Sequence, residues 1–236
     1  MPHRTTNIAG LSPILLTHLH PLALLTSYFL QFPSLVASPP STLFSSVFPL
    51  TMIQVAYAVL CLDNAALPHG HSTSTTEKKS KSGSLRPKKA DSASSGGIAG
   101  HILPISLSLL LTTTLFTSLI TILLFLFGAP FTTHHSHTIL TATHISLLIA
   151  FPLIYVHKLD SQKWSEILSF TLPLDEVFAA TVGGMIGSWC GAVPIPLDWD
   201  EPWQKWPCTI LTGAYLGYVV GKFMGMYVVK GKKLVF

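Results

Sequence analysis

The sequence predicts an all-α protein, a polytopic membrane helix bundle with about six transmembrane helices and both termini in the cytosol. Apolar residues make up 49% of the 236 residues, charged residues make up 10%, and the mean hydropathy is +0.52, outside the range of ordinary soluble domains. No Asp, Glu, Lys or Arg occurs between Arg4 and Asp63, or between Asp91 and Lys158. The apolar segments are continuous and lack a period of two, which favours helices over strands.

Six segments approach the length of about 20 apolar residues that a helix needs to cross the hydrocarbon core. The predicted spans are residues 13–32, 43–62, 102–127, 139–155, 178–193 and 208–229. His18 and His20 interrupt the first span, and the fifth is short and rich in glycine. We expect His18, His20 and His144 to form hydrogen bonds within the bundle, since an ionisable side chain at membrane depth needs a partner.

A hydrophilic segment, 63–100, separates spans one and two (residues 1–62) from spans three to six (residues 101–236). It is rich in serine and carries six basic residues, and it has too little apolar surface to fold alone. We therefore predict a disordered cytosolic linker. A solvated loop that sets topology is the favoured interpretation, and binding of anionic lipid headgroups or phosphorylation of its serines is the alternative.

The positions of positive charge predict the orientation, because short cytosolic loops are enriched in Lys and Arg. Six spans with a cytosolic linker place Arg4, Lys158 and Lys163 on one face, together with the lysines of the tail after residue 229. The opposite face receives the loops 129–137 and 194–207. All basic clusters then share one side, which favours six spans over five or seven.

The sequence predicts no catalytic residue, no cofactor site and no metal site. The three cysteines lie in or at the ends of apolar spans without C-x-x-C spacing, so packing is favoured over a disulfide framework or zinc binding. His134, His135 and His137 have a spacing near that of metal ligands, but no carboxylate or cysteine stands nearby in sequence. A polar lumenal loop is therefore favoured over a metal site.

Two ladders of glycine mark the last third of the chain. Residues four apart lie on one helix face, so each ladder predicts a groove without side chains where another backbone can approach closely. We expect tight helix packing, either between spans five and six or against a partner subunit. The glycines of the two ladders are Gly183, Gly187, Gly191, Gly213, Gly217, Gly221 and Gly225.

The loop between the ladders is rich in proline, tryptophan and acidic residues. Asp200 or Glu201 can cap a short helix that begins at Pro202, and Trp203 and Trp206 would then share one face. Indole rings prefer the headgroup region, so we expect this lumenal loop to lie along the membrane surface, as a rigid connector or as a lipid or partner contact. The residues singled out are Pro194, Pro196, Asp198, Trp199, Asp200, Pro202, Trp203, Trp206 and Pro207.

Four segments between Leu172 and Gly221 closely resemble the PIG-F family of glycosylphosphatidylinositol (GPI) anchor biosynthesis. The segment Pro-Ile-Pro-Leu-Asp-Trp-Asp, with the Pro-Trp and Trp-Pro pairs that follow it, is the most specific of them. The segments are Leu-Pro-Leu-Asp-Glu-Val-Phe at 172–178, Gly-Ser-Trp-Cys-Gly-Ala at 187–192, the loop 194–207 and Gly-Ala-Tyr-Leu-Gly-Tyr at 213–218.

The resemblance implies a multi-pass protein of the endoplasmic reticulum membrane that is not itself a catalyst. It implies association with the ethanolamine phosphate transferase catalytic subunits that act on the second and third mannoses of the GPI glycan. Membrane lipids are the other expected contacts, and no nucleic acid is expected. In the expected mechanism the glycine-laddered helices pack against the transferase and the loop supports its lumenal active site.

Two other functions remain open from the residues alone. An intramembrane lipid-modifying enzyme could use Asp198, Asp200 and Glu201 as acid, base or metal ligands. A lipid or small-molecule transporter would depend on Lys222, the single candidate charge inside a span. For Lys222 we favour a side chain that extends to the cytosolic headgroups over one that binds a partner or lipid headgroup.

Overall fold

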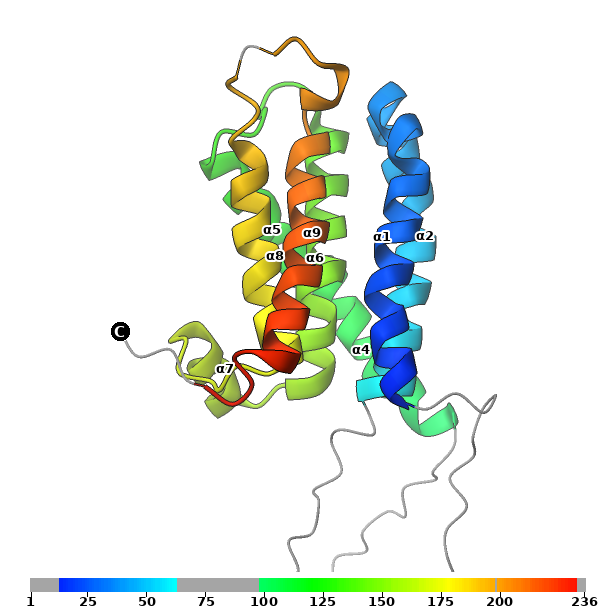
Figure 1. The fold of residues 1–236 in the computed structure, drawn as a ribbon, viewed down its shortest axis with the longest axis vertical. Helices are drawn as coiled ribbons and strands as arrows, with labels where there is room; N and C mark the ends of the chain where they lie inside the picture. The colour runs from blue at the N-terminus through cyan, green and yellow to red at the C-terminus, as the bar shows by residue number, and fades with distance from the viewer. Residues whose placement is uncertain (1–12, 63–97, 198, 233–236) are drawn as a thin grey trace, which may run out of the picture.

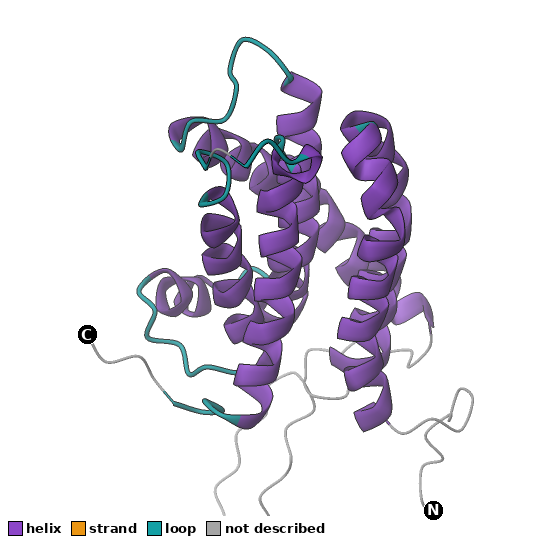
Figure 2. Ribbon diagram, turned by 45° about the horizontal axis from the view of Figure 1, so that its top comes forward, coloured by secondary structure: helices purple, strands orange, loops and turns teal. Residues whose placement is uncertain are grey.

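The computed structural model describes residues 13–62, 98–197 and 199–232, and all regular structure in these residues is helical (Figure 2). The helices and helical turns are α1 (Pro13–Ala37), α2 (Pro39–Tyr57), η1 (Ala58–Leu62), α4 (Ile98–Leu111), η2 (Thr112–Phe116), α5 (Thr117–Leu126), α6 (His135–His157), α7 (Ser161–Leu168), α8 (Glu176–Ala192), η3 (Pro202–Gln204) and α9 (Cys208–Tyr227).

The long helices form an antiparallel bundle in which successive rods run in opposite directions (Figure 1). The wide helical turn η1 extends α2, and η2 joins α4 to α5 in one rod. Each of the six predicted segments is therefore helical. Three rods, Pro39–Leu62, Gly100–Leu126 and His135–His157, are long and apolar enough to cross a membrane.

Helix α6 lies at the centre of the bundle because it is apolar on all sides. Fifteen of its residues are buried, from Thr138 to Tyr155, and it packs against α2, α5, α8 and α9. The pair α1–α2 stands beside the group formed by α6, α8 and α9 (Figure 1). The interior of the molecule therefore lies between this hairpin and α6, α8 and α9.

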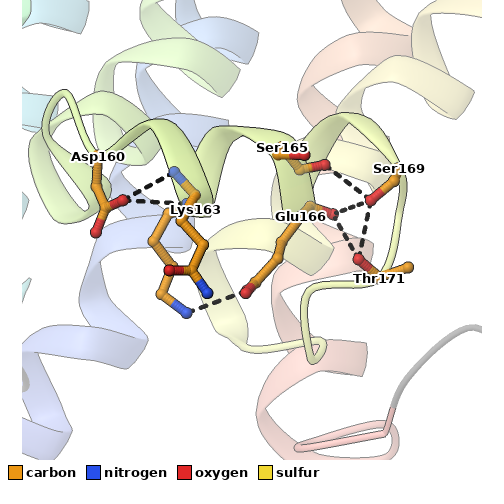
Figure 3. Close-up of polar contacts among 7 residues, drawn as sticks. Asp160, Lys163, Ser165, Glu166, Ser169 and Thr171 are labelled. Carbon is orange, nitrogen blue, oxygen red and sulfur yellow. Dashed lines mark hydrogen bonds and ion pairs between the residues drawn. The ribbon is translucent and has the colours of Figure 1, made fainter.

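Helix α7 has no counterpart among the predicted elements, because its eight residues are too few and too polar for a span. Asp160 begins the helix by accepting hydrogen bonds from the backbone N–H groups of Gln162 and Lys163, at 2.9 and 3.3 Å. Lys163 and Glu166 form an ion pair at 3.1 Å, and the Ser169 hydroxyl closes the last turn (Figure 3).

The end of the predicted linker differs from the prediction, and several predicted segments lie outside the described residues. Helix α4 begins at Ile98, so residues 98–100 belong to a helix and not to the linker. The rest of the predicted linker, the amino terminus with Arg4 and the last four residues of the tail lie outside the described residues, as does Asp198.

Candidate functional site: the paired glycine helices, their loop and a buried lysine

Helix α8 begins at a well-formed cap. The Asp175 carboxylate accepts hydrogen bonds from the backbone N–H groups of Val177 and Phe178, at 3.0 and 2.7 Å. Such a cap satisfies N–H groups that have no partner within the helix. The cap therefore fixes the residue at which α8 begins.

The structure brings the two glycine ladders together. A Cβ atom added to Gly217 would meet the carbonyl oxygen of Gly183 and would stand 2.7 Å from the Cα atom of Gly187. A Cβ atom at Gly221 would lie 2.9 Å from the Cα atom of Gly183. The neighbours are backbone atoms, which cannot rotate away. The close approach of α8 and α9 therefore requires glycine at these positions.

The other glycines of the two ladders also lie in the contact between α8 and α9. Gly187 and Gly213 face each other, and Gly191 faces the backbone of Thr209 and Ile210. At the far end Gly225 faces Asp175 and Ala179. The ladders are therefore occupied within this chain, which is the first of the two alternatives that the sequence leaves open.

One side of the α8–α9 pair forms an open apolar groove of about 680 Å³. Glycines of both ladders line its floor, and its rims include Ile186 of α8 and Leu216 and Val220 of α9. These three rim side chains are 42–59% exposed. The described part of the chain thus leaves the groove uncovered along the glycine seam.

The loop after α8 is held by the side chain of Gln204, a residue for which the sequence predicted no role. Gln204 donates to the carbonyl oxygens of Pro194 and Leu197, at 2.8 and 2.7 Å, and accepts from the N–H of Glu201 at 3.0 Å. Glu201 in turn caps η3, so Glu201 and not Asp200 provides the predicted cap. The sequence contained a signal for this role of Gln204, because Glu201 and Gln204 have the three-residue spacing of a capping box.

The three tryptophans of the loop do not share one face. The rings of Trp199 and Trp203 lie 5.8 Å apart, and Trp199 is 53% exposed. Trp206 instead packs against the buried apolar cluster of the bundle, with its indole nitrogen buried. The short η3 ends at Gln204, so the helical spacing that would align Trp203 with Trp206 is not maintained.

The other loop residues singled out from the sequence differ in their exposure. Pro194 contributes to the groove lining, Pro196 and Pro202 are exposed, and Pro207 is buried before α9. Asp200 adopts a left-handed backbone conformation with φ of 52°. Asp198 lies outside the described residues, so its relation to Asp200 and Glu201 stays a prediction.

Lys222 is completely buried, which corrects the expectation that its side chain extends to the headgroups. Its Nζ atom lies 3.0 Å from Nδ1 of His20 and 3.6 Å from the centre of the Tyr57 ring. The Tyr57 hydroxyl donates to Glu176 at 3.0 Å. The ammonium group therefore finds a hydrogen-bond acceptor and an aromatic face inside the bundle, where contact with water is lost.

The orientation of His20 follows from its second contact. Nε2 of His20 lies 3.3 Å from Oε1 of Gln54, and the Gln54 amide nitrogen donates to the carbonyl of Leu148 at 3.3 Å. Because Oε1 can only accept, Nε2 carries the proton and Nδ1 is free to accept from Lys222. These residues, Lys222, His20, Gln54, Tyr57 and Glu176, are called the lysine cluster below.

The expected hydrogen bonds of the membrane histidines are confirmed. Besides the contact of His20, the Tyr227 hydroxyl bonds to Nε2 of His18 at 2.9 Å, and Nδ1 of His144 bonds to the Tyr215 hydroxyl at 3.1 Å. Each bond joins helices that are far apart in sequence, so no local pattern could have identified the partner.

Within the described ranges no three His, Cys, Asp or Glu side chains are arranged to hold a metal ion. His134 and His137 are neighbours at the start of α6, with ring centres 4.8 Å apart. The cysteines are free thiols: Cys208 is buried, Cys190 is exposed and Cys61 lies between these extremes.

The fold and the site define an all-helical membrane protein. Two of its helices are in backbone contact through glycines, a hydrogen-bonded loop connects them at one end, and the lysine cluster lies in the interior. The model of the GPI biosynthesis protein family Pig-F matches residues 19–226, and the chain belongs to this family. The match extends well beyond the segments 172–221 that suggested it.

Two fungal relatives align with most of the chain. Glycosylphosphatidylinositol anchor biosynthesis protein 11 of Neurospora crassa is 42% identical over 92% of this chain and 75% of its own length. The protein of the same name from Aspergillus fumigatus is 40% identical over 86% and 75%, respectively. A human relative, 33% identical over 41% of this chain and 46% of its own length, is the GPI ethanolamine phosphate transferase, stabilizing subunit. No solved structure matches the chain.

Proposed function

We propose that this chain is a non-catalytic stabilising subunit of the ethanolamine phosphate transferases that modify mannoses of the GPI precursor in the endoplasmic reticulum membrane. The observation that carries the proposal is the family match over residues 19–226, together with the name of the human relative, a stabilizing subunit of such a transferase. The expected partners are the catalytic subunits that act on the second and third mannoses.

The proposed topology has six membrane crossings with both termini cytosolic. Six antiparallel rods support it, because the turn after α1, the loop after α5 and the loop before α9 lie at one end of the bundle (Figure 1). At the other end of the bundle Lys158 precedes α7, Lys163 lies in its first turn, and Lys232 follows α9. The carbonyl of Lys232 accepts a hydrogen bond from Leu174 at 2.9 Å, which joins these basic segments. This distribution agrees with a cytosolic basic face.

In the proposed mechanism the loop 194–207 contacts the membrane-proximal part of the transferase on the lumenal side. Gln204 and the cap of η3 hold the loop in one conformation, so little entropy is lost when a partner binds. The exposed ring of Trp199 lies against Trp203 at that surface. Aromatic side chains held in this way are typical anchors of protein interfaces.

Affinity purification tests the proposal. The tagged full-length chain, extracted in mild detergent from its own host, should co-purify with a GPI ethanolamine phosphate transferase, as identified by mass spectrometry. The purified chain without that partner should transfer no ethanolamine phosphate to a mannose. Recovery of the chain without any transferase, or transfer activity of the isolated chain, would contradict the proposal.

A further inference from the structure

Glycines line the floor of the α8–α9 groove, and this determines what shape can fill it. On α8 the floor residues Gly183 and Gly187 are adjacent to the rim residues Val182 and Ile186, and the same alternation recurs on α9. Because glycine has no side chain, the floor of the groove is formed by backbone atoms. Each rim is a row of side chains that are spaced four residues apart along its helix, one row on α8 and one on α9. A ridge of large side chains spaced by four residues is complementary to such a groove.

The groove extends over the whole depth of the bundle. Its lining runs from Pro194 and Trp203, beyond one end of α8, to Leu174 and Val229, beyond the other. A helix the length of α8, 17 residues, is about 26 Å long, close to the hydrocarbon thickness of about 30 Å. One acyl chain occupies one leaflet and therefore about half of this length. A transmembrane helix matches the full length.

A second copy of this chain does not fit as well. A symmetric contact places the same surface on both subunits, so the groove of one copy would face the groove of the other. Two hollows opposite each other leave unfilled space, and in lipid the loss of van der Waals contacts is not offset by burial of apolar surface. None of the described residues that line the groove is charged, so we expect the occupant to be apolar there.

We propose that the α8–α9 groove is the seat of one transmembrane helix of the transferase, which inserts a ridge of large aliphatic side chains between the rows led by Ile186 and Val220. This inference rests on the proposed function. Trp203 lines the lumenal end of the groove, so the same partner helix emerges beside the Trp199–Trp203 pair. The groove and the loop thus form one continuous contact surface.

Site-specific photocrosslinking tests the seat in the full-length chain. A photoreactive phenylalanine at position 186 or 220 should form a covalent adduct with the transferase in the membrane. The control is position 119 on α5, because Leu119 is 55% exposed, as Ile186 and Val220 are at 57% and 59%, yet it lies outside the groove. We expect adducts with the transferase from both groove positions and none from the control.

Substitutions that fill the groove give a second measurement. Ile186→Trp and Val220→Trp place an indole where the partner ridge would lie, and we expect the amount of co-purified transferase to fall roughly tenfold or more, while Leu119→Trp leaves it unchanged. Size-exclusion profiles of the variants establish that the chain itself remains folded.

The outcomes separate this inference from the proposed function. If the unmodified chain binds the transferase but positions 186 and 220 crosslink to lipid, to a second copy or to nothing, the groove is not the seat and the proposed function stands. If both Trp variants are folded and bind the transferase as well as the unmodified chain does, the groove is likewise not the seat, and the proposed function stands. If the unmodified chain binds no transferase, both proposals fail.

Discussion

Lys222 carries its positive charge in the interior of the bundle, and the lysine cluster explains how it is tolerated. A charge at the centre of a transmembrane helix costs about 2.5–3.5 kcal/mol on insertion scales. Nδ1 of His20 and the face of Tyr57 contact the ammonium group at 3.0 and 3.6 Å, and the chain of hydrogen bonds continues through Gln54 to α6. Removal of one member therefore leaves a buried polar atom of its neighbour without that hydrogen bond.

A double-mutant cycle should reveal this coupling. Lys222→Met leaves Nδ1 of His20 without a donor, and His20→Phe retains the ring against Tyr57 but removes the acceptor. Each single variant should lose about 1–3 kcal/mol of stability, and the double variant should lose less than the sum by about 1 kcal/mol. Midpoints of thermal unfolding in mild detergent measure the effect, at about 2–4 °C per kcal/mol.

Lys230→Met provides the control, because Lys230 is exposed after α9. Its midpoint should match that of the unsubstituted chain. A Lys222→Met midpoint equal to the Lys230→Met midpoint would mean that the Lys222 ammonium group interacts with solvent or headgroups, contrary to the structure.

At the scale of elements, the α8–α9 pair is the most closely packed contact of the bundle. The backbone of each helix occupies the space where a side chain of the other would stand. A bulky residue at Gly217 would therefore separate the two helices of this chain before it could affect a partner. Loss of a partner after such a substitution would not identify the glycines as the docking surface, which is why the rim positions are the informative ones.

Gly217→Ala should destabilise the chain by about 1–3 kcal/mol, the usual cost of overpacking a rigid contact. The added methyl group would lie 2.7 Å from the Cα atom of Gly187, and neither backbone can yield without moving a helix. The measurement is the midpoint of thermal unfolding in mild detergent. Ser106→Thr adds one carbon to an exposed position on α4 and should leave the midpoint unchanged. An unshifted Gly217→Ala midpoint would show that α8 and α9 are not in backbone contact.

At the scale of the whole molecule, buried polar contacts join the α1–α2 hairpin to the rest of the bundle. The Tyr28 hydroxyl of α1 lies 2.8 Å from the Thr212 hydroxyl of α9, and Nε2 of His144 lies 3.0 Å from the carbonyl of Leu43 on α2. Such bonds are directional, so they specify one arrangement of the hairpin where apolar packing alone would permit several.

The orientation of the whole bundle can be measured with single cysteines in a variant without Cys61, Cys190 and Cys208. In sealed microsomes a membrane-impermeant maleimide should label Ser161→Cys without detergent, because α7 faces the cytosol in the proposed topology. Lys205→Cys, in the loop before α9, should react only after detergent opens the vesicles. The reverse pattern would place the loop on the cytosolic side and remove the proposed lumenal contact.

Much of the fold could be predicted because hydropathy is a local property. Each of the six predicted segments coincides with a helical rod, and the glycine spacing indicates which faces permit close approach. The additional helix α7 was missed because it is short and polar, although its Asp cap and Trp164 resemble those of an interfacial helix. Trp206 was assigned to the wrong face because the turn of η3 ends before it.

Composition and local spacing were enough to predict that the chain is apolar and helical, where its long helices lie, and which family its last third resembles, since these depend on residues close together along the chain. Three features became visible in the folded chain alone: the two glycine ladders face each other, Gln204 holds the loop, and Lys222 contacts His20. Lys222 and His20 are 202 positions apart. Contacts of that kind depend on how whole helices pack, which no local pattern specifies.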